Sequence, residues 1–188
     1  MALKVSGRAM EIPPFYVMEV MRAADARADS GHAVYHMEVG QPGTGAPQGA
    51  LLAAEKSLRS QRLGYTDAQG MPELRAAIAK RYQDNYGLRV APSRVVATTG
   101  SSAAFVLAFL AAFDAGDRVA LAAPGYPCYA NILRALGIEP VLLLTTAQDR
   151  FQPRPALLDQ ARTEGPLDGP IVASAAHPPG TRKGTEPC

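Results

Sequence analysis

Residues Val95–Phe105 read Val-Val-Ala-Thr-Thr-Gly-Ser-Ser-Ala-Ala-Phe, and this stretch decides the fold of the chain. A short β-branched run leads to Gly100, two serines follow, and Ala103–Phe113 is apolar on all sides. This order predicts a strand over Val95–Thr98, a tight turn at the glycine, and then a buried helix.

The turn itself has the properties of an anion site. Gly100 lets the backbone turn sharply and approach a ligand closely. Ser101 and Ser102 fall where the helix starts, and their hydroxyls can donate hydrogen bonds. The first amides of a helix have no internal partner and its dipole favours negative charge there, so the turn is a candidate phosphate site. Serines at a helix start can also be plain caps, and this alternative stays open.

Downstream of the turn, apolar strands alternate with helices. The expected strands are Arg118–Ala123, Val141–Leu144 and Pro170–Ala175, and the expected helices are Pro127–Leu136 and Arg154–Arg162. This alternation predicts an α/β fold, with a mostly parallel sheet covered by helices on both faces. Ligands of such folds gather beyond the carboxyl ends of the strands, where Gly100, Tyr126 and His177 fall.

The chain before the turn is predicted to be mainly helical. Its expected elements are an irregular start over Met1–Pro14, helices over Phe15–Arg27, Gln48–Ser60 and from Pro72 to Tyr86, and a β-like run over Val34–Val39. Two loops rich in glycine separate them, Gly40–Pro47 and Gly64–Gly70. Such loops are connectors unless their backbone amides face a pocket.

Composition narrows the functional class. The chain has 188 residues and a net charge of +2, so it has no basic footprint for nucleic acid and no attraction to a membrane surface. No apolar run approaches the ~20 residues of a membrane span, and no secretion leader precedes the first helix. Two cysteines, Cys128 and Cys188, indicate neither a disulfide scaffold nor a metal site. A cytoplasmic globular protein without a metal is expected, with Cys128 as a small apolar filler.

Four motifs occur in an order that resembles a known family. They are Gly64-Tyr65-Thr66 with Gly70 and Glu73-Leu74-Arg75, Thr99-Gly100-Ser101, Pro124-Gly125-Tyr126-Pro127-Cys128-Tyr129, and Ser174-Ala175-Ala176-His177-Pro178-Pro179-Gly180-Thr181. The series resembles the class I/II aminotransferases, fold-type-I enzymes that use pyridoxal 5′-phosphate (PLP). Residues 12–20 look like the N-terminal arm of that family, and the resemblance extends from about residue 8 to residue 181.

The resemblance implies a cofactor site. Gly100, Ser101 and Ser102 would hold the PLP phosphate, and Tyr126 would stack on the pyridine ring. His177 stands where the family has the asparagine that hydrogen-bonds the phenolic oxygen of PLP. The residues alone leave two alternatives open: Tyr126 can simply pack between the sheet and the next helix, and His177 can be a solvated loop residue.

Two further roles are implied. Tyr65 would reach the PLP phosphate of the neighbouring subunit in a homodimer, and the Gly40 backbone would face the substrate carboxylate. The substrates would be an amino acid and a 2-oxo acid. If the chain is monomeric, Tyr65 is better explained as an exposed loop aromatic.

The chain departs from the family near its end. PLP chemistry needs a lysine, a carboxylate and an arginine clamp, which the family places after the motif at 174–181, and Lys4, Lys56, Lys80 and Lys183 do not match that lysine. The expected organisation is an arm and the start of the small domain at 1–45, part of the large domain at 46–181, and an aberrant tail at 182–188. The prediction is therefore a truncated aminotransferase that is inactive alone. The alternatives are a PLP lyase or synthase of the same fold and a non-catalytic remnant.

Overall fold

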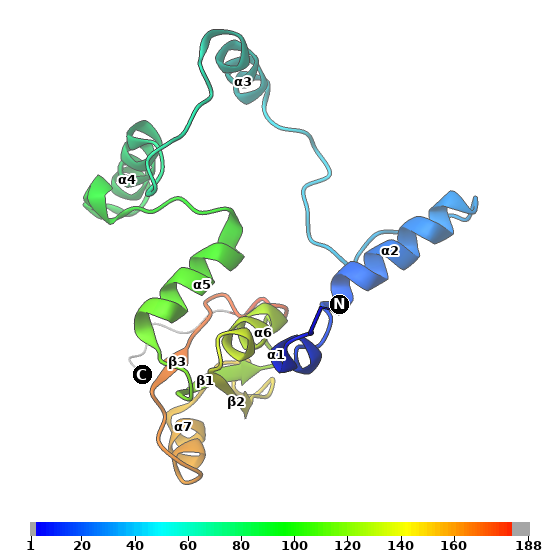
Figure 1. Cartoon of the computed structure of the whole chain (residues 1–188), viewed down its shortest axis with the longest axis vertical. Helices are drawn as coiled ribbons and strands as arrows, with labels where there is room; N and C mark the ends of the chain where they lie inside the picture. Colours follow the sequence, from blue (N-terminus) through cyan, green and yellow to red (C-terminus); the bar gives the residue numbers. More distant parts are fainter. Residues whose placement is uncertain (1–2, 182–188) are drawn as a thin grey trace. The chain divides into compact units, whose positions relative to one another are not determined.

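A computed structural model of the chain describes residues 3–181. The described residues divide into two units, residues 16–98 and residues 3–15 together with residues 99–181, and each is described by itself. Figure 1 labels the helices and strands of both units. The boundaries predicted at residues 45 and 181 stay predictions, and the predicted tail at 182–188 lies outside the described residues.

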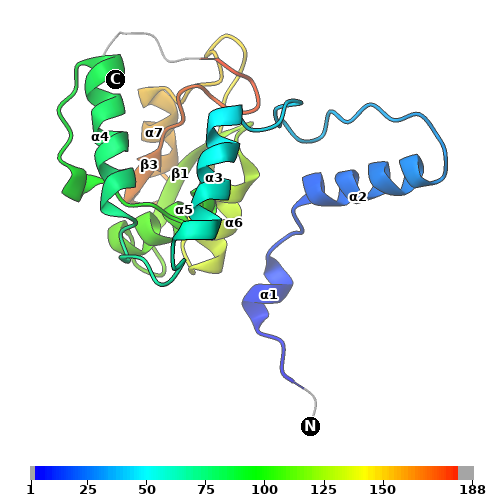
Figure 2. The same ribbon diagram turned by 90° about the horizontal axis from the view of Figure 1, so that it is seen from above.

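A parallel sheet forms the centre of the second of these units. β1 (Arg118–Ala123) lies between β2 (Glu139–Leu144) and β3 (Gly169–Ile171), in the order β2-β1-β3. In register, Arg118 pairs with Glu139, and Val119 pairs with Gly169. Figure 2 shows β3 beside β1 from above. The middle of β1 is buried because it has a neighbouring strand on each side and helices on each face.

Helices cover both faces of this sheet, as the alternation predicts. On one face, α5 (Gly100–Ala112) and α6 (Pro127–Ala135) enclose the larger core. Its buried members are Phe109, Val119, Leu121, Leu133 and Ile138. On the other face, α7 (Pro155–Arg162) buries Ala161 against Ala120 and Leu143. The predicted α/β class is confirmed, and the predicted helix bounds differ from these by a few residues at most.

Polar contacts fix the amino ends of the strands and one end of α6. The Arg118 backbone amide donates to the Asp168 carboxylate at 2.8 Å, and the Arg118 side chain lies 3.3 Å from Glu139, so one residue links all three strands. Arg8 donates to the Ala135 carbonyl at 3.0 Å, which places a cation at the negative end of the α6 dipole. Arg8 belongs to α1 (Gly7–Glu11), a short helix inside the stretch predicted to be irregular, and that prediction is wrong.

The prediction that the apolar helix after Gly100 is buried holds for one face only. Phe105, Phe109 and Phe113 recur every four residues, and their ring centroids lie 5.8 and 6.3 Å apart along the packed face. On the opposite face Leu107 and Leu110 are 56% and 61% exposed. Uniform hydrophobicity hides the orientation of a helix, because the sequence then has no polar side to mark the solvent.

Two predicted strands are absent from the described residues. No strand is assigned over Val95–Thr98 or Val34–Val39, and β3 ends at Ile171 although a strand to Ala175 was predicted. A β-branched run needs a neighbour to hydrogen-bond, and the Ala97 amide instead donates to the Gln69 carbonyl at 2.9 Å. These strand predictions are therefore wrong for the structure.

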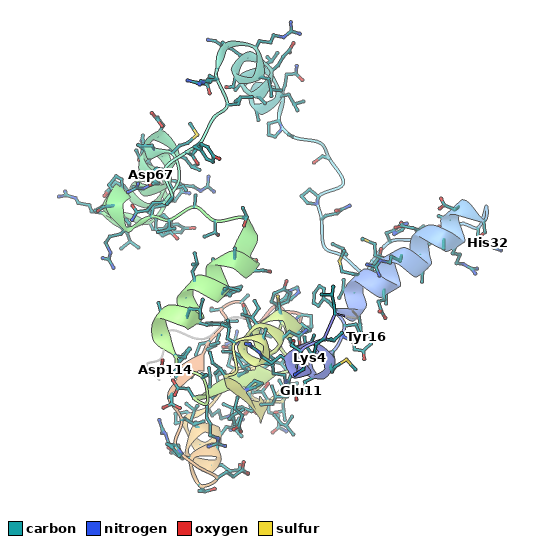
Figure 3. All side chains as sticks on the ribbon, in the orientation of Figure 1. Lys4, Glu11, Tyr16, His32, Asp67 and Asp114 are labelled. Atoms are coloured by element: carbon teal, nitrogen blue, oxygen red, sulfur yellow. The ribbon has the colours of Figure 1, made fainter. Side chains whose placement is uncertain are left out.

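The unit of residues 16–98 is helical, as predicted. It contains α2 (Tyr16–Asp29), α3 (Gln48–Ser60), α4 (Pro72–Tyr86) and a 3₁₀ turn, η1 (Pro92–Arg94). Pro72 begins α4, and Gly87 ends it with φ of 68°. Arg75 ties α4 to η1 by donating to the Pro92 carbonyl at 3.1 Å, and it lies 3.9 Å from Asp67. Asp67, in the loop before α4, is labelled in Figure 3.

An ion pair in this unit predicts a pH dependence. His36 Nδ1 lies 2.8 Å from Glu38 Oε1, and this hydrogen bond raises the pKa of His36 above 6.5 and lowers the pKa of Glu38 below 4.5. The stability that His36 contributes is fully present at low pH and is lost as pH rises through the folded pKa of His36. The stability that Glu38 contributes is lost as pH falls through the folded pKa of Glu38. The ion pair is therefore formed between these two pKa values. NMR titration should give His36 a raised pKa that falls in Glu38→Gln; an unchanged pKa in that variant would contradict the pairing.

Candidate functional site

Side chains from three segments meet at one edge of the sheet. Ser102 Oγ, in the first turn of α5, lies 3.6 Å from Cys128 Sγ in the first turn of α6. Tyr126 directly precedes α6, and its ring centroid lies 5.7 Å from that of His177, at an interplanar angle of 74°. Because Tyr126 follows β1 and His177 follows β3, the cluster lies beyond the carboxyl ends of parallel strands, where ligands of such folds bind.

The start of α5 leaves room for a ligand. Gly100 has φ of +82°, a conformation that favours glycine, and nothing lies within 4 Å of the place its Cβ would occupy. Thr99 is the N-cap residue but its side chain makes no capping hydrogen bond. Ser101 and Ser102 are exposed. The first turn of this 13-residue helix therefore carries two exposed hydroxyls, and hydroxyls at a helix start suit a phosphate group.

Tyr126 is held in a fixed place by its neighbours. Gly125 precedes it, and a Cβ there would lie 2.4 Å from the Ala122 carbonyl oxygen, so only glycine fits this turn. The Tyr126 ring meets three other rings edge to face, at centroid distances of 6.2 Å to Phe15, 5.4 Å to Tyr129 and 5.7 Å to His177. Such edge contacts stabilise a ring in one orientation. Tyr126 thus lies between β1 and α6, as the packing alternative has it, and also contacts His177.

Burial raises the pKa of the Tyr126 hydroxyl. Its pKa is raised above 10.0, chiefly because burial disfavours the phenolate, with smaller effects from Cys128 and Tyr129. At neutral pH the hydroxyl is uncharged, as in any tyrosine, and it can donate a hydrogen bond. Cys128 contacts both Ser102 and the Tyr126 hydroxyl. The sequence had predicted Cys128 to be a small apolar filler. The signal that could have found it is its position inside the Pro124–Tyr129 motif.

His177 sits on a loop that is internally bonded. The Ala176 amide donates to the Thr181 carbonyl at 2.7 Å, and the Gly180 amide donates to the Ala176 carbonyl at 2.6 Å. Ala176 is buried, whereas His177 is exposed and turned toward Tyr126. The solvated-loop alternative is thus correct about exposure and incomplete about contacts.

Gly40 and Tyr65 belong to the unit of residues 16–98 and are described there by themselves. Both are exposed, and Tyr65 is exposed over its whole side chain. Their predicted roles stay predictions.

In residues 3–181 no helix could cross a membrane, and no group of three histidine, cysteine or acidic side chains could hold a metal ion.

Comparison of the sequence and structure with those of known proteins identifies the family of this chain. The profile described as aminotransferase class I and II aligns with residues 34–182, which is most of the chain. The chain belongs to the class I and II aminotransferases. The fold is therefore that of part of an aminotransferase, as the resemblance implied.

Several individual aminotransferases are similar in sequence or structure to this chain. The valine–pyruvate aminotransferase of Mycobacterium tuberculosis is 52% identical over 170 residues, which cover 90% of this chain and 43% of that protein. The (5-formylfuran-3-yl)methyl phosphate transaminase of Methanocaldococcus jannaschii is 35% identical over 73% of this chain and 37% of that protein. The crystal structure of an aminotransferase from M. tuberculosis superposes with a TM-score of 0.87 at 51% identity, covering 94% of this chain and 45% of that one. The chain thus spans less than half the length of these aminotransferases.

Proposed function

We propose that this chain supplies the PLP-phosphate seat of an aminotransferase, the start of α5 at Gly100–Ser102. The observation that carries the proposal is the juxtaposition of the exposed Ser101 and Ser102 at this helix start with Tyr126, through the contact between Ser102 and Cys128. The amides and hydroxyls of Ser101 and Ser102 would hold the phosphate, and the dipole of α5 would favour its negative charge. When bound, PLP supplies the electron sink that stabilises an amino acid after its Cα proton leaves.

The aromatic side of the cluster would orient the ring of the cofactor. Tyr126 offers an aromatic surface whose direction is set by its edge contacts, and its protonated hydroxyl can donate a hydrogen bond. His177 occupies the place of the family asparagine, and its imidazole carries an N–H that can donate to an oxygen beside Tyr126. These residues bind and orient, and none of them is a covalent partner for PLP.

Substrates and assembly follow the family. We infer an amino acid and a 2-oxo acid as substrates, and valine with pyruvate is the first pair to test because of the 52% identical relative. We further propose that Gly40 faces the substrate carboxylate, and that Tyr65 serves the site of a second subunit in a homodimer. An extended, fully exposed tyrosine is suited to reach across an interface.

The phosphate seat can be tested on the 188-residue polypeptide. Pyridoxamine 5′-phosphate is the probe, because its amine cannot form an imine with the exposed lysines Lys4, Lys56 and Lys80. Calorimetric titration should show one saturable site, with pyridoxamine, which lacks the phosphate, binding at least about tenfold more weakly. Equal binding of the two probes, or binding of neither, would overturn the proposal.

The same polypeptide is expected to show no turnover of valine and pyruvate with added PLP. None of Lys4, Lys56 and Lys80 stands where the family motifs place the PLP lysine, and Lys183 lies outside the described residues. Alanine formation followed by mass spectrometry provides the measurement. Steady formation of alanine that depends on PLP would show that a lysine of this polypeptide performs the chemistry.

A further inference from the structure

We propose that Gln152 is a positioning residue, whose side-chain amide clips the loop of residues 174–181 so that His177 lies against Tyr126. Gln152 is only 8% exposed. Its Nε2 donates to the Ala173 carbonyl at 3.4 Å and to the Thr181 carbonyl at 3.5 Å. These two residues bracket the loop, so a single amide group joins the ends of the segment that carries His177.

A second contact from the same turn holds the same loop. The Thr181 hydroxyl donates to the Arg150 carbonyl. The Thr181 carbonyl, already bound by Gln152, also accepts from the Ala176 amide inside the loop at 2.7 Å. Thr181 is therefore the point where the turn around Gln152 and the loop around His177 meet.

The turn adopts an unfavourable backbone to make these contacts. Arg150 and Phe151 have φ of 52° and 54°, in the left-handed region that residues other than glycine rarely occupy. Asp149 holds the turn from the other side, accepting from the Thr146 amide at 3.2 Å and from its hydroxyl at 2.9 Å. Asp149 also forms an ion pair with Arg154 at the start of α7. A strained segment persists where its surroundings enforce it, and here it directs both Gln152 and the Arg150 carbonyl at the loop.

The chemistry of Gln152 supports a donor role over simple packing. Its Oε1 is buried and has no hydrogen-bond partner among residues 3–181. A buried amide with one unpaired oxygen is less favourable than an apolar side chain of the same size. The amide is therefore best explained by the two bonds of its nitrogen. That the clipped loop serves a cofactor rests on the proposed function, but the clip itself is a property of the chain without any ligand.

The test uses Gln152→Met in the 188-residue polypeptide, with Gln160→Met as the matched control. Methionine keeps the length of the side chain and removes both donors, and Gln160 is exposed on α7. Hydrogen exchange by NMR should show the Ala176 and Gly180 amides exchanging at least about fivefold faster in Gln152→Met, with β1 amides unchanged. The His177 ring protons should also shift toward their free values as Tyr126 is lost as a neighbour. Gln160→Met should change neither signal.

Gln152→Leu keeps the proposal testable if Gln152→Met fails to fold, because leucine also removes both donors. It should likewise speed exchange at Ala176 and Gly180 and move the His177 signals in the same direction. Unchanged exchange and unchanged His177 signals in a folded Gln152→Met, or in Gln152→Leu when the first variant does not fold, would overturn the clip. Because no ligand is present in either measurement, failure of the clip is distinct from failure of the phosphate seat.

Discussion

Replacing Leu133 by alanine is expected to lower the free energy of unfolding by about 2–5 kcal/mol. Leu133 lies on α6, is 0% exposed, and packs in the core with Phe109, Val119 and Leu121. Removing its branched end leaves a cavity between the helices and β1, because the interior relaxes only in part. Urea unfolding followed by circular dichroism provides the measurement, since the chain has no tryptophan.

Leu107→Ala is the matched control for this prediction. The chemical change is the same, but Leu107 lies on α5 with 56% of its surface exposed. Exposed substitutions of this kind change stability by about 0.5 kcal/mol or less. Equal losses in the two variants would show that α6 does not pack on β1 as described.

Replacing Ser101 by aspartate is expected to weaken binding of pyridoxamine 5′-phosphate about 30-fold to 100-fold while slightly stabilising the chain. A carboxylate about 4 Å from a phosphate charge costs up to about 4 kcal/mol at an effective dielectric of 20, and exposure of the seat reduces this cost. The same carboxylate at the start of α5 gains about 0.3–1 kcal/mol from the helix dipole. Calorimetry gives the affinity and urea unfolding gives the stability.

Ser101→Asn separates charge from shape in this experiment. Asparagine has the size of aspartate and is neutral, so it should cost much less affinity. For an anion site at a helix start, Ser101→Asp should lower the affinity for pyridoxamine 5′-phosphate and raise the free energy of unfolding. If Ser101→Asp binds the probe as well as the unchanged chain does, the phosphate does not lie at this helix start.

The elements predictable from sequence are those with local signals. Pro72 and Gly87 mark the ends of α4, and the apolar run of β1 marks a central strand, so their bounds agree with the structure. The exposed face of α5 was not predictable, because Leu107 and Leu110 are as apolar as the residues on its packed face. Val95–Thr98 failed for a different reason: strand propensity says nothing about whether a partner strand is present.

The candidate site divides in the same way. Gly100 and its two serines carry a local signal, the chemistry of a helix start, and the ordered motifs pointed to Tyr126 and His177. Cys128 and Gln152 act through contacts with residues far away in the chain, at separations of 26 residues to Ser102 and 29 residues to Thr181. No periodicity or propensity encodes such contacts; the sequence marks Cys128 only by its place in the Pro124–Tyr129 motif and does not mark Gln152.

The order of the strands has a consequence for folding kinetics. β1 meets β2 across a separation of 21 residues, as from Arg118 to Glu139, but it meets β3 across 50, as from Arg118 to Asp168. Closing the longer segment costs about 0.8 kcal/mol more chain entropy, so β1, α6 and β2 can assemble before β3 docks. The segment carrying His177 follows β3 directly. We therefore expect its place beside Tyr126 to be established late in folding, after β1, α6 and β2 have assembled.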